Sequence, residues 1–197
     1  MPNFKIVVMG DINAGKRTLI DRLVGKPYEE SLSIFSPPTP TALTQGADTF
    51  TFINGHVNNE SRWGRGQNET RAKSNFQNCK AIIFALDPLS NDSVSNFESY
   101  IEMARASSMD HINILVVITK SDITQNDAAA QKRIDQIKNL SKEHYLPCVE
   151  ASAKTNDKIP LIKDWTVNVA KGLSFEIEDT HAPANKSSPK TGGCSIS

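Results

Sequence analysis

The feature of this sequence that most constrains its fold is an alternation of buried-strand and helix patterns. Three nearly continuous apolar runs, at residues 4–9, 81–86 and 112–119, are typical of strands covered on both faces of a parallel sheet. Amphipathic patterns indicate helices at residues 17–24, 90–107, 131–145 and 158–173. The alternation predicts an α/β fold: a single doubly wound, mostly parallel sheet with helices on both faces.

Weaker patterns complete the prediction. Residues 49–53 alternate Thr and Phe, which indicates an exposed or edge strand, and residues 147–151 are a fifth strand candidate. The segment 31–45 is predicted to be irregular at its proline-rich centre. The segment 54–77 is polar and is predicted as loop with weak helix. We expect one domain over residues 1–173 and a disordered tail over 174–197, where the residues are polar and small.

Charge and cysteine content limit the function classes. The 22 Lys and Arg residues balance the 22 Asp and Glu residues, which argues against general nucleic-acid binding. Three widely spaced cysteines are typical of a reduced, intracellular compartment. No apolar run is long enough to span a bilayer and no signal-peptide pattern is present, so a cytoplasmic location is expected.

Residues 10–16 read Gly-Asp-Ile-Asn-Ala-Gly-Lys and have the spacing of a phosphate-binding loop. They follow a predicted buried strand and open a predicted helix, so backbone N–H groups and the helix dipole would converge on phosphate. The alternative is an ordinary strand–helix turn with a solvated lysine. The candidate nucleotide-binding residues of this segment are Gly10, Asp11, Ile12, Asn13, Ala14, Gly15, Lys16, Arg17 and Thr18.

Two further motifs follow later predicted strands, at the edge where ligands bind in open α/β sheets. They are Thr-Lys-Ser-Asp at 119–122 and Ala-Ser-Ala-Lys at 151–154. Together with the phosphate-loop pattern, and with the segment 75–101, they resemble the small GTPases of the Ras superfamily, most closely the Rab branch. The similarity covers roughly residues 3–172, and it implies the P-loop small GTPase fold.

The resemblance implies GTP or GDP as the ligand. Asp122 would accept the N1–H and N2–H groups of guanine together, which adenine cannot offer. The stem of Lys120 would cover the base, Thr119 stands for the family's Asn that ties the two loops, and the turn of Ser152, Ala153 and Lys154 would approach the guanine carbonyl. Without the other motifs, Asp122 would read as a turn aspartate.

Several positions depart from the family pattern, mainly where it binds Mg²⁺. Arg17 replaces the hydroxyl residue that ligates the metal, and its guanidinium is expected to stand in or beside the metal's place. The alignment puts Phe52 at the position of the Asp that orders the metal, and Asp48 is a poor substitute four residues earlier. Ile12 stands where a small residue is common. Thr18, one position late, is the only weak metal candidate in the loop.

The switch and catalytic residues are also altered. The switch threonine has three candidates, Ser33, Ser36 and Thr39. His56 aligns with the family's water-positioning Gln, but a loop histidine without a catalytic role is the favoured alternative. Because metal and carboxylate are both in question, GTP hydrolysis is expected to be weak or absent.

The last four residues, Cys194-Ser195-Ile196-Ser197, fit a prenylation box, with an unmodified polar tail as the alternative. A single lipid on Cys194 with few basic neighbours gives weak, reversible attachment. The expectation is a cytoplasmic protein held on the cytosolic face of a membrane, with effector, exchange and prenylation-related proteins as partners.

Three functions remain open from the sequence. The first is a Rab-like GTPase that regulates vesicle traffic. The second is a pseudoGTPase scaffold that binds partners without nucleotide switching. The third is an ATP-using P-loop enzyme, which the motifs at 119–122 and 151–154 disfavour. The nucleotide that the protein carries distinguishes all three.

Overall fold

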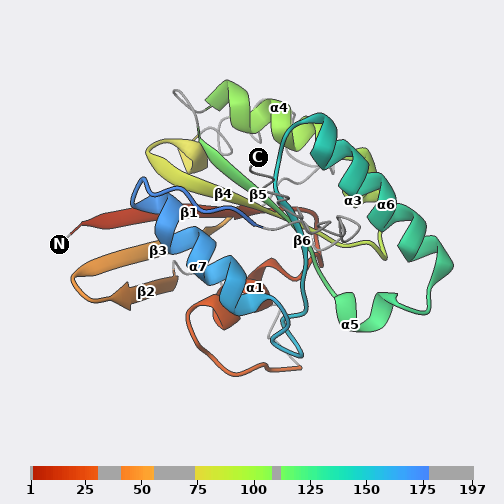
Figure 1. Ribbon diagram of the computed structural model, residues 1–197, viewed down its shortest axis with the longest axis horizontal. Coiled ribbons are helices and arrows are strands. Elements are labelled where there is room, and N and C mark those ends of the chain that lie inside the picture. Colours follow the sequence, from red (N-terminus) through yellow and green to blue (C-terminus); the bar gives the residue numbers. More distant parts are fainter. Residues whose placement is uncertain (1, 31–40, 56–73, 108–111, 178–197) are drawn as a thin grey trace, which may run out of the picture.

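A central β-sheet organises the structure, a computed structural model that describes residues 2–30, 41–55, 74–107 and 112–177 (Figure 1). The strand order in the described part is β2-β3-β1-β4-β5-β6. Only β2 runs antiparallel to its neighbour, and all other pairs are parallel. The strands are β1 (Asn3–Met9), β2 (Thr41–Gln45), β3 (Asp48–Asn54), β4 (Cys79–Leu86), β5 (Asn113–Ile118) and β6 (Cys148–Glu150).

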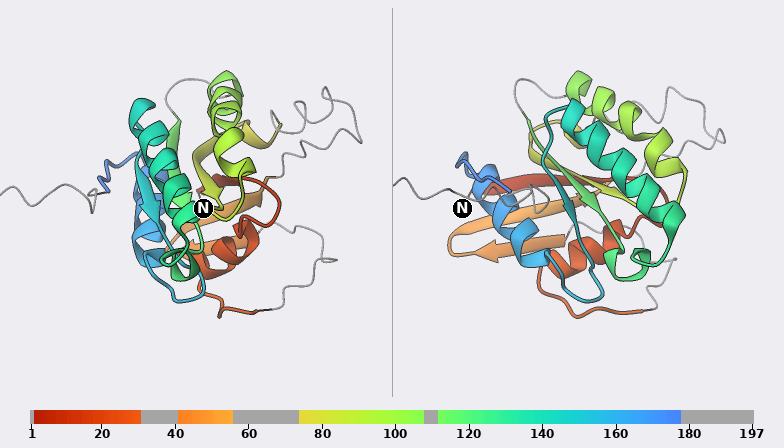
Figure 2. Two further views of the ribbon diagram at one scale, coloured as in Figure 1. Left: turned by 90° about the vertical axis from the view of Figure 1, so that its right-hand side faces the viewer. Right: turned by 45° about the vertical axis from the view of Figure 1, so that its right-hand side comes forward.

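Helices cover both faces of this sheet (Figures 1 and 2). Helices α1 and α7 lie on one face, and α3, α4 and α6 lie on the other. The predicted fold class is therefore confirmed: an α/β fold with a single doubly wound, mostly parallel sheet and helices on both faces. The helices are α1 (Lys16–Leu23), α3 (Asp92–Ser95), α4 (Phe97–Ser107), α5 (Ser121–Thr124), α6 (Ala128–Glu143) and α7 (Ile159–Ala170).

Each face of the sheet has its own apolar core. Leu19 and Leu23 of α1 and Trp165 of α7 pack on the first face, where Phe50 and Phe52 of β3 are also buried. On the second face, β4 and β5 residues pack under α4 and α6. Because β1, β4 and β5 are covered on both sides, their sequences are nearly continuous apolar runs.

The prediction of an edge strand at residues 49–53 is wrong. Strand β3 lies inside the sheet between β2 and β1, and Phe50 and Phe52 are 0% and 1% exposed. Because Thr alternates with Phe along β3, its sequence has the pattern of a strand with one exposed face. In the described sheet the edge strand next to β3 is β2, which lies at the end of the segment 31–45, where no strand was predicted. Strand β2 contacts the sheet only through β3 and its residues are exposed or half-buried, so it carries no strong apolar pattern.

Two helix predictions also change. The helix expected at 90–107 is broken at Asn96 into α3 and α4. Helix α6 begins earlier than expected because Asp127 caps it, accepting hydrogen bonds from the backbone N–H groups of Ala129 (2.9 Å) and Ala130 (3.0 Å).

The end of the described chain stays in contact with the domain. Phe175 and Ile177 pack against the first apolar core, so contacts continue past the predicted boundary at residue 173. The rest of the predicted tail, 178–197, lies outside the described residues. Within the described ranges, no helix has the length and apolar character needed to cross a bilayer.

Candidate nucleotide-binding site

The segment from Gly10 to Lys16 connects the end of β1 to the start of α1 and has the strand–loop–helix context that phosphate binding needs. Gly10 has a φ of 147°, and a Cβ there would lie 1.9 Å from the carbonyl oxygen of Ala85 in β4. Only glycine fits this position. Gly15 has a φ of 74° and precedes α1, whose first N–H groups have no partners inside the helix.

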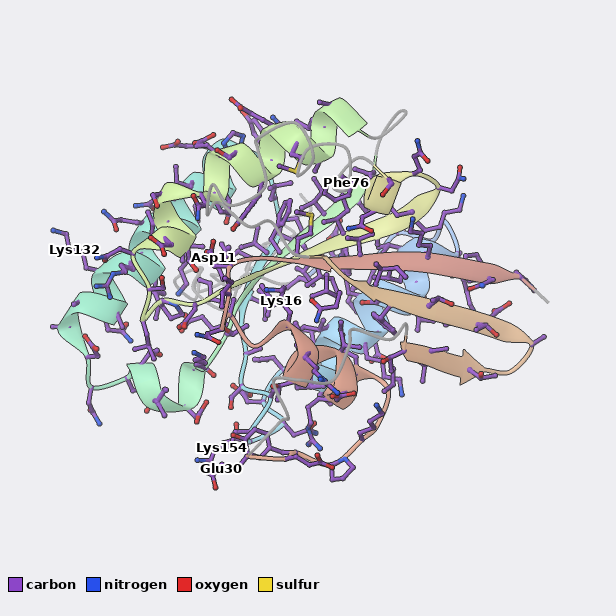
Figure 3. All side chains as sticks on the ribbon, turned by 180° about the vertical axis from the view of Figure 1, so that it is seen from behind. Asp11, Lys16, Glu30, Phe76, Lys132 and Lys154 are labelled. Carbon is purple, nitrogen blue, oxygen red and sulfur yellow. The ribbon has the colours of Figure 1, made fainter. Side chains whose placement is uncertain are left out.

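Lys16 is directed back over its own loop. Its Nζ donates to the carbonyl oxygens of Gly10 (2.9 Å) and Asp11 (2.5 Å), and the residue is only 4% exposed. Asp11 and Lys16 lie together where β1 ends (Figure 3). Burial lowers the pKa of Lys16 to about 8, and the nearby charge of Asp11 partly opposes this shift. The ammonium therefore lies over the carbonyl oxygens of its own loop, and Lys16 does not line the pocket described below.

The other loop residues have distinct positions. The side chain of Asp11 is buried and turned toward helices α3 and α4, so it does not line the pocket described below. Ile12 is 56% exposed and Asn13 has a left-handed φ of 66°. Ala14 is buried, and its carbonyl oxygen contacts the second nucleotide loop.

Thr119 joins the two predicted nucleotide loops. Its Oγ1 lies 3.1 Å from the carbonyl oxygen of Ala14 and 3.1 Å from that of Leu86. The side chain is buried, with 7% exposure for the residue. A hydroxyl thus makes the connection for which the family uses an amide, and the departure at this position leaves the link in place.

Lys120 is oriented by a buried carboxylate. Its Nζ lies 2.7 Å from Oδ2 of Asp87, which follows β4 and is 5% exposed. Lys120 has a left-handed φ of 62° and lines the pocket. With its ammonium held at Asp87, the aliphatic stem is available to cover an apolar face, such as that of a base.

Asp122 and Ser152 come together from two loops. The Ser152 hydroxyl donates to Oδ1 of Asp122 at 2.7 Å, and Ser152 is fully buried. The same hydroxyl accepts the backbone N–H of Thr155 at 3.2 Å, which fixes its direction. These contacts hold the Asp122 carboxylate in one orientation, as recognition of two adjacent donors requires.

One pocket of about 240 Å³ is lined by residues from both loops. Gly15 and Thr18 of the first loop share this cavity with Thr119, Lys120 and Asp122 of the second. Ala153 and Lys154 also line it. Five lining residues were not predicted as site residues, and of these only Ala151 lies in a motif, the segment 151–154: Leu19, Tyr28, Val117, Ile123 and Ala151.

Of the positions considered for a metal, Thr18 lines this pocket, while Arg17, Asp48 and Phe52 do not. The guanidinium of Arg17 lies along α1, with its Nε 4.0 Å from Oδ2 of Asp21, and Arg17 does not line the pocket. The structure thus differs from the expectation that Arg17 replaces the cation. Asp48 starts β3 at the far end of that strand and pairs with Lys171 at 2.6 Å.

Phe52 is part of the apolar core, as its side chain packs on the α1 and α7 face of the sheet. Two residues further along β3, Asn54 occupies the same face near the end of the strand. Its Oδ1 is buried, and no donor within the described residues reaches it. The side-chain amide of Asn54 carries no negative charge, and Arg17 has no hydroxyl that could ligate a metal. The described residues therefore do not fit the family's Mg²⁺ site. They also contain no cluster of three acidic, His or Cys side chains.

Several predicted residues lie outside the described residues. They are the candidate catalytic His56, the switch candidates Ser33, Ser36 and Thr39, and the lipidation candidate Cys194.

The fold and the paired loops define the P-loop class of nucleotide-binding domains. The sequence matches the Ras family over residues 5–170, and the chain belongs to that family. None of the curated proteins matches it.

Two solved structures share the fold. A mutation variant of SsGBP has a TM-score of 0.65, with 21% identity over 86% of this chain and 55% of the other. A GTP-binding protein from the hyperthermophilic archaeon Sulfolobus solfataricus, in complex with GDP, has a TM-score of 0.62, with 21% identity over 87% of this chain and 53% of the other. The chain therefore spans about half the length of these proteins.

Proposed function

We propose that this protein binds guanine nucleotide and acts as a Rab-like regulator on a membrane, with weak or absent GTP hydrolysis. One observation carries the proposal: a single pocket joins the phosphate loop to an Asp122 carboxylate that the Ser152 hydroxyl holds in place. The pocket thus pairs a group suited to two adjacent donors with a loop suited to phosphate. Family membership and the GDP bound to the archaeal protein support this proposal.

The base is selected by hydrogen-bond complementarity. Guanine presents N1–H and N2–H side by side, and a fixed carboxylate accepts both. Adenine offers an acceptor at N1, which faces the same carboxylate unfavourably. Lys120 covers the base with its stem, and Tyr28 adds an aromatic wall to the pocket. Lys16 then supplies positive charge to the phosphates.

Slow hydrolysis follows from the altered metal positions. Phosphoryl transfer depends on positive charge clamped to the phosphate oxygens. Among the described residues, Lys16 has the required place, while Arg17 lies beside Asp21. We therefore expect nucleotide to be held for long periods, and partners rather than hydrolysis to set the state of the protein.

The second candidate is the pseudoGTPase scaffold, which the loss of metal donors at positions 17 and 52 favours. The experiment is to identify the nucleotide released when purified protein is denatured, and then to titrate GDP, GTP and ADP. Guanine nucleotide on the protein and selectivity for GDP over ADP of about 100-fold or more support the proposal. Absence of any nucleotide affinity supports the scaffold, and ADP selectivity supports an ATP-using enzyme.

Membrane attachment is a separate part of the proposal. It is supported by the residues Cys194-Ser195-Ile196-Ser197, whose pattern resembles a prenylation box. Mass spectrometry of protein from eukaryotic cells should show a prenyl group on Cys194, and Cys194→Ser should move the protein to the soluble fraction. Cys148→Ser, which alters another cysteine, is the control that should leave the distribution unchanged. An unmodified C-terminus on the native protein contradicts this part alone.

A further inference from the structure

The phosphate loop contains a buried carboxylate that points away from the nucleotide pocket. Asp11 is 8% exposed, and its Oδ2 accepts the Ser93 hydroxyl at 2.9 Å. Its Oδ1 accepts Nδ2 of Asn96 at 2.8 Å and the hydroxyl of Tyr100. Burying a carboxylate is costly unless donors replace water. Three side-chain donors do so here, which makes Asp11 the most fully held polar group of the loop.

The three donors come from the helices on the opposite side of the loop from α1. Ser93 belongs to α3, Tyr100 to α4, and Asn96 is the residue at which the two helices separate. The Tyr100 ring stacks on Phe84 of β4, with centroids 5.9 Å apart and planes 21° apart. Burial and the bond to Asp11 both raise the pKa of Tyr100, so the phenol stays a donor. The contacts of Asp11 with Ser93, Asn96 and Tyr100, called the anchor below, therefore hold the carboxylate in one place.

The anchor also connects to the base-binding loop. The Ser93 hydroxyl accepts the backbone N–H of Asp87 at 2.9 Å while it donates to Asp11. Asp87 in turn holds Lys120. A continuous chain of polar contacts, buried except at Lys120, thus runs from the base loop through α3 to the phosphate loop.

The backbone of Asp11 contacts the main phosphate-binding group. Its carbonyl oxygen accepts Nζ of Lys16 at 2.5 Å. The side chain of Asp11 fixes the residue against α3 and α4, and the fixed residue orients the carbonyl that holds Lys16. One residue therefore links the position of the Lys16 ammonium to the position of helix α4.

We propose that Asp11 is a positioning residue: held by Ser93, Asn96 and Tyr100, it sets the phosphate loop and Lys16 for the nucleotide's phosphates. This inference rests on the proposed function and deepens it. It assigns Asp11 no contact with the nucleotide through its side chain. The effect of removing the anchor should therefore appear in phosphate affinity and leave base affinity unchanged.

The test compares GDP with guanosine, which has the base and sugar but no phosphate, as competitors of a fluorescent GDP analogue. Asp11→Ala should weaken GDP binding about tenfold or more, as expected when buried donors lose their acceptor. Guanosine affinity should stay within about twofold. Asp11→Asn keeps an oxygen for Asn96 and Tyr100 and should recover most of the GDP affinity.

A gentler variant makes the test independent of folding defects. Tyr100→Phe keeps the ring that stacks on Phe84 and removes only the hydroxyl, and should weaken GDP binding about fivefold. Tyr145→Phe is the matched control because Tyr145 is 94% exposed, and it should change neither affinity. Thermal unfolding of each nucleotide-free variant accompanies the titrations.

Two results would overturn the inference while the proposed function stands. One is wild-type GDP affinity in both Asp11→Ala and Tyr100→Phe. The other is an equal loss of GDP and guanosine affinity in step with the melting temperature, which indicates a purely structural role. Failure of the proposed function looks different, because wild-type protein would then bind neither ligand, and the inference would fall with it.

Discussion

The two ends of the nucleotide pocket differ in how much of the family's chemistry they retain. At the base end, two pairs of side chains are in contact at 2.7 Å: Ser152 with Asp122, and Lys120 with Asp87. At the metal end, Arg17 turns to Asp21, and Phe52 packs in the core. The base end therefore has oriented side chains that could contact a base, while at the metal end Arg17 and Phe52 offer no ligand for a metal.

The difference shows what keeps a binding loop in shape. The phosphate loop is held by the close approach of Gly10 to Ala85, by the contact of Thr119 with Ala14 and by the bonds of Asp11 to α3 and α4. All of these are contacts within the protein, and none requires a metal. A chain can therefore lose metal donors and keep the loop geometry that binds phosphate.

The largest effect should come from disrupting the close contact of Gly10 with Ala85 of β4, which supports both ends of the pocket. Gly10→Ala places a Cβ 1.9 Å from the Ala85 carbonyl oxygen at a backbone angle that L-residues avoid. We expect a loss of about 3 kcal/mol or more in the free energy of unfolding, and no GDP binding. Urea denaturation measures the loss.

The control for this variant is Gly172→Ala. Gly172 also has a positive φ, of 79°, but its Cβ would meet nothing within 4 Å. It should cost about 1 kcal/mol and leave GDP binding intact. Equal costs for the two variants would mean that the contact between the loop and β4 is not what frames the pocket.

Substitutions of Asp122 test how the base end of the pocket recognises guanine. Asp122→Ala should weaken GDP binding by about 2 kcal/mol or more, roughly 30-fold, because guanine loses a charged acceptor. Asp122→Asn should shift preference to xanthine nucleotides, whose C2 carbonyl accepts the amide N–H. Calorimetry with GDP and XDP measures both. Unchanged GDP affinity in the alanine variant would mean that Asp122 does not bind guanine.

The charge of Lys16 gives a pH dependence at the phosphate end. Its pKa in the free protein is about 8, because burial disfavours the ammonium. Phosphate needs the protonated form, so GDP affinity should be steady below about pH 7 and fall about fivefold between pH 8 and pH 9. Guanosine binding controls for titration of the base. A GDP affinity that follows guanosine across this range would contradict the assigned role of Lys16.

The link between the two ends is tested at Thr119. Thr119→Val keeps the shape and removes the hydroxyl that contacts Ala14, so GDP affinity should fall about fivefold, or about 1 kcal/mol. Thr119→Ser keeps the hydroxyl and should stay within about twofold of wild type. If the valine variant binds GDP as the serine variant does, the hydroxyl does not join the loops functionally.

The sequence predicted the parts of the molecule that local pattern controls. Strands β1, β4 and β5 are buried on both faces and read as continuous apolar runs, and Gly10, Lys16 and Asp122 stand at fixed spacings next to them. Strand β2 was missed because it touches only one neighbour and carries no periodic apolar signal. Burial of β3 was missed for a related reason, since Thr alternates with Phe along it.

The contacts that the sequence could not predict join residues far apart in the chain. Asp11 meets Tyr100 across 89 positions, and Thr119 meets Ala14 across 105. Tyr28 reaches the pocket from the segment that follows α1, without a motif around it. The direction of Arg17 was also beyond sequence reasoning, because either Asp21 or a phosphate could attract a guanidinium, and only the packed structure distinguishes the two.

The measurement that tests the central claim most directly is GDP titration in Mg²⁺ and in EDTA. If the protein holds nucleotide through the base end, the phosphate loop and Lys16 without a metal, the two dissociation constants should agree within about twofold. Arg17→Ser, which returns a hydroxyl to the loop without restoring a carboxylate on β3, should gain only a small Mg²⁺ response. A loss of affinity of about 100-fold or more in EDTA for the wild-type protein would contradict the account.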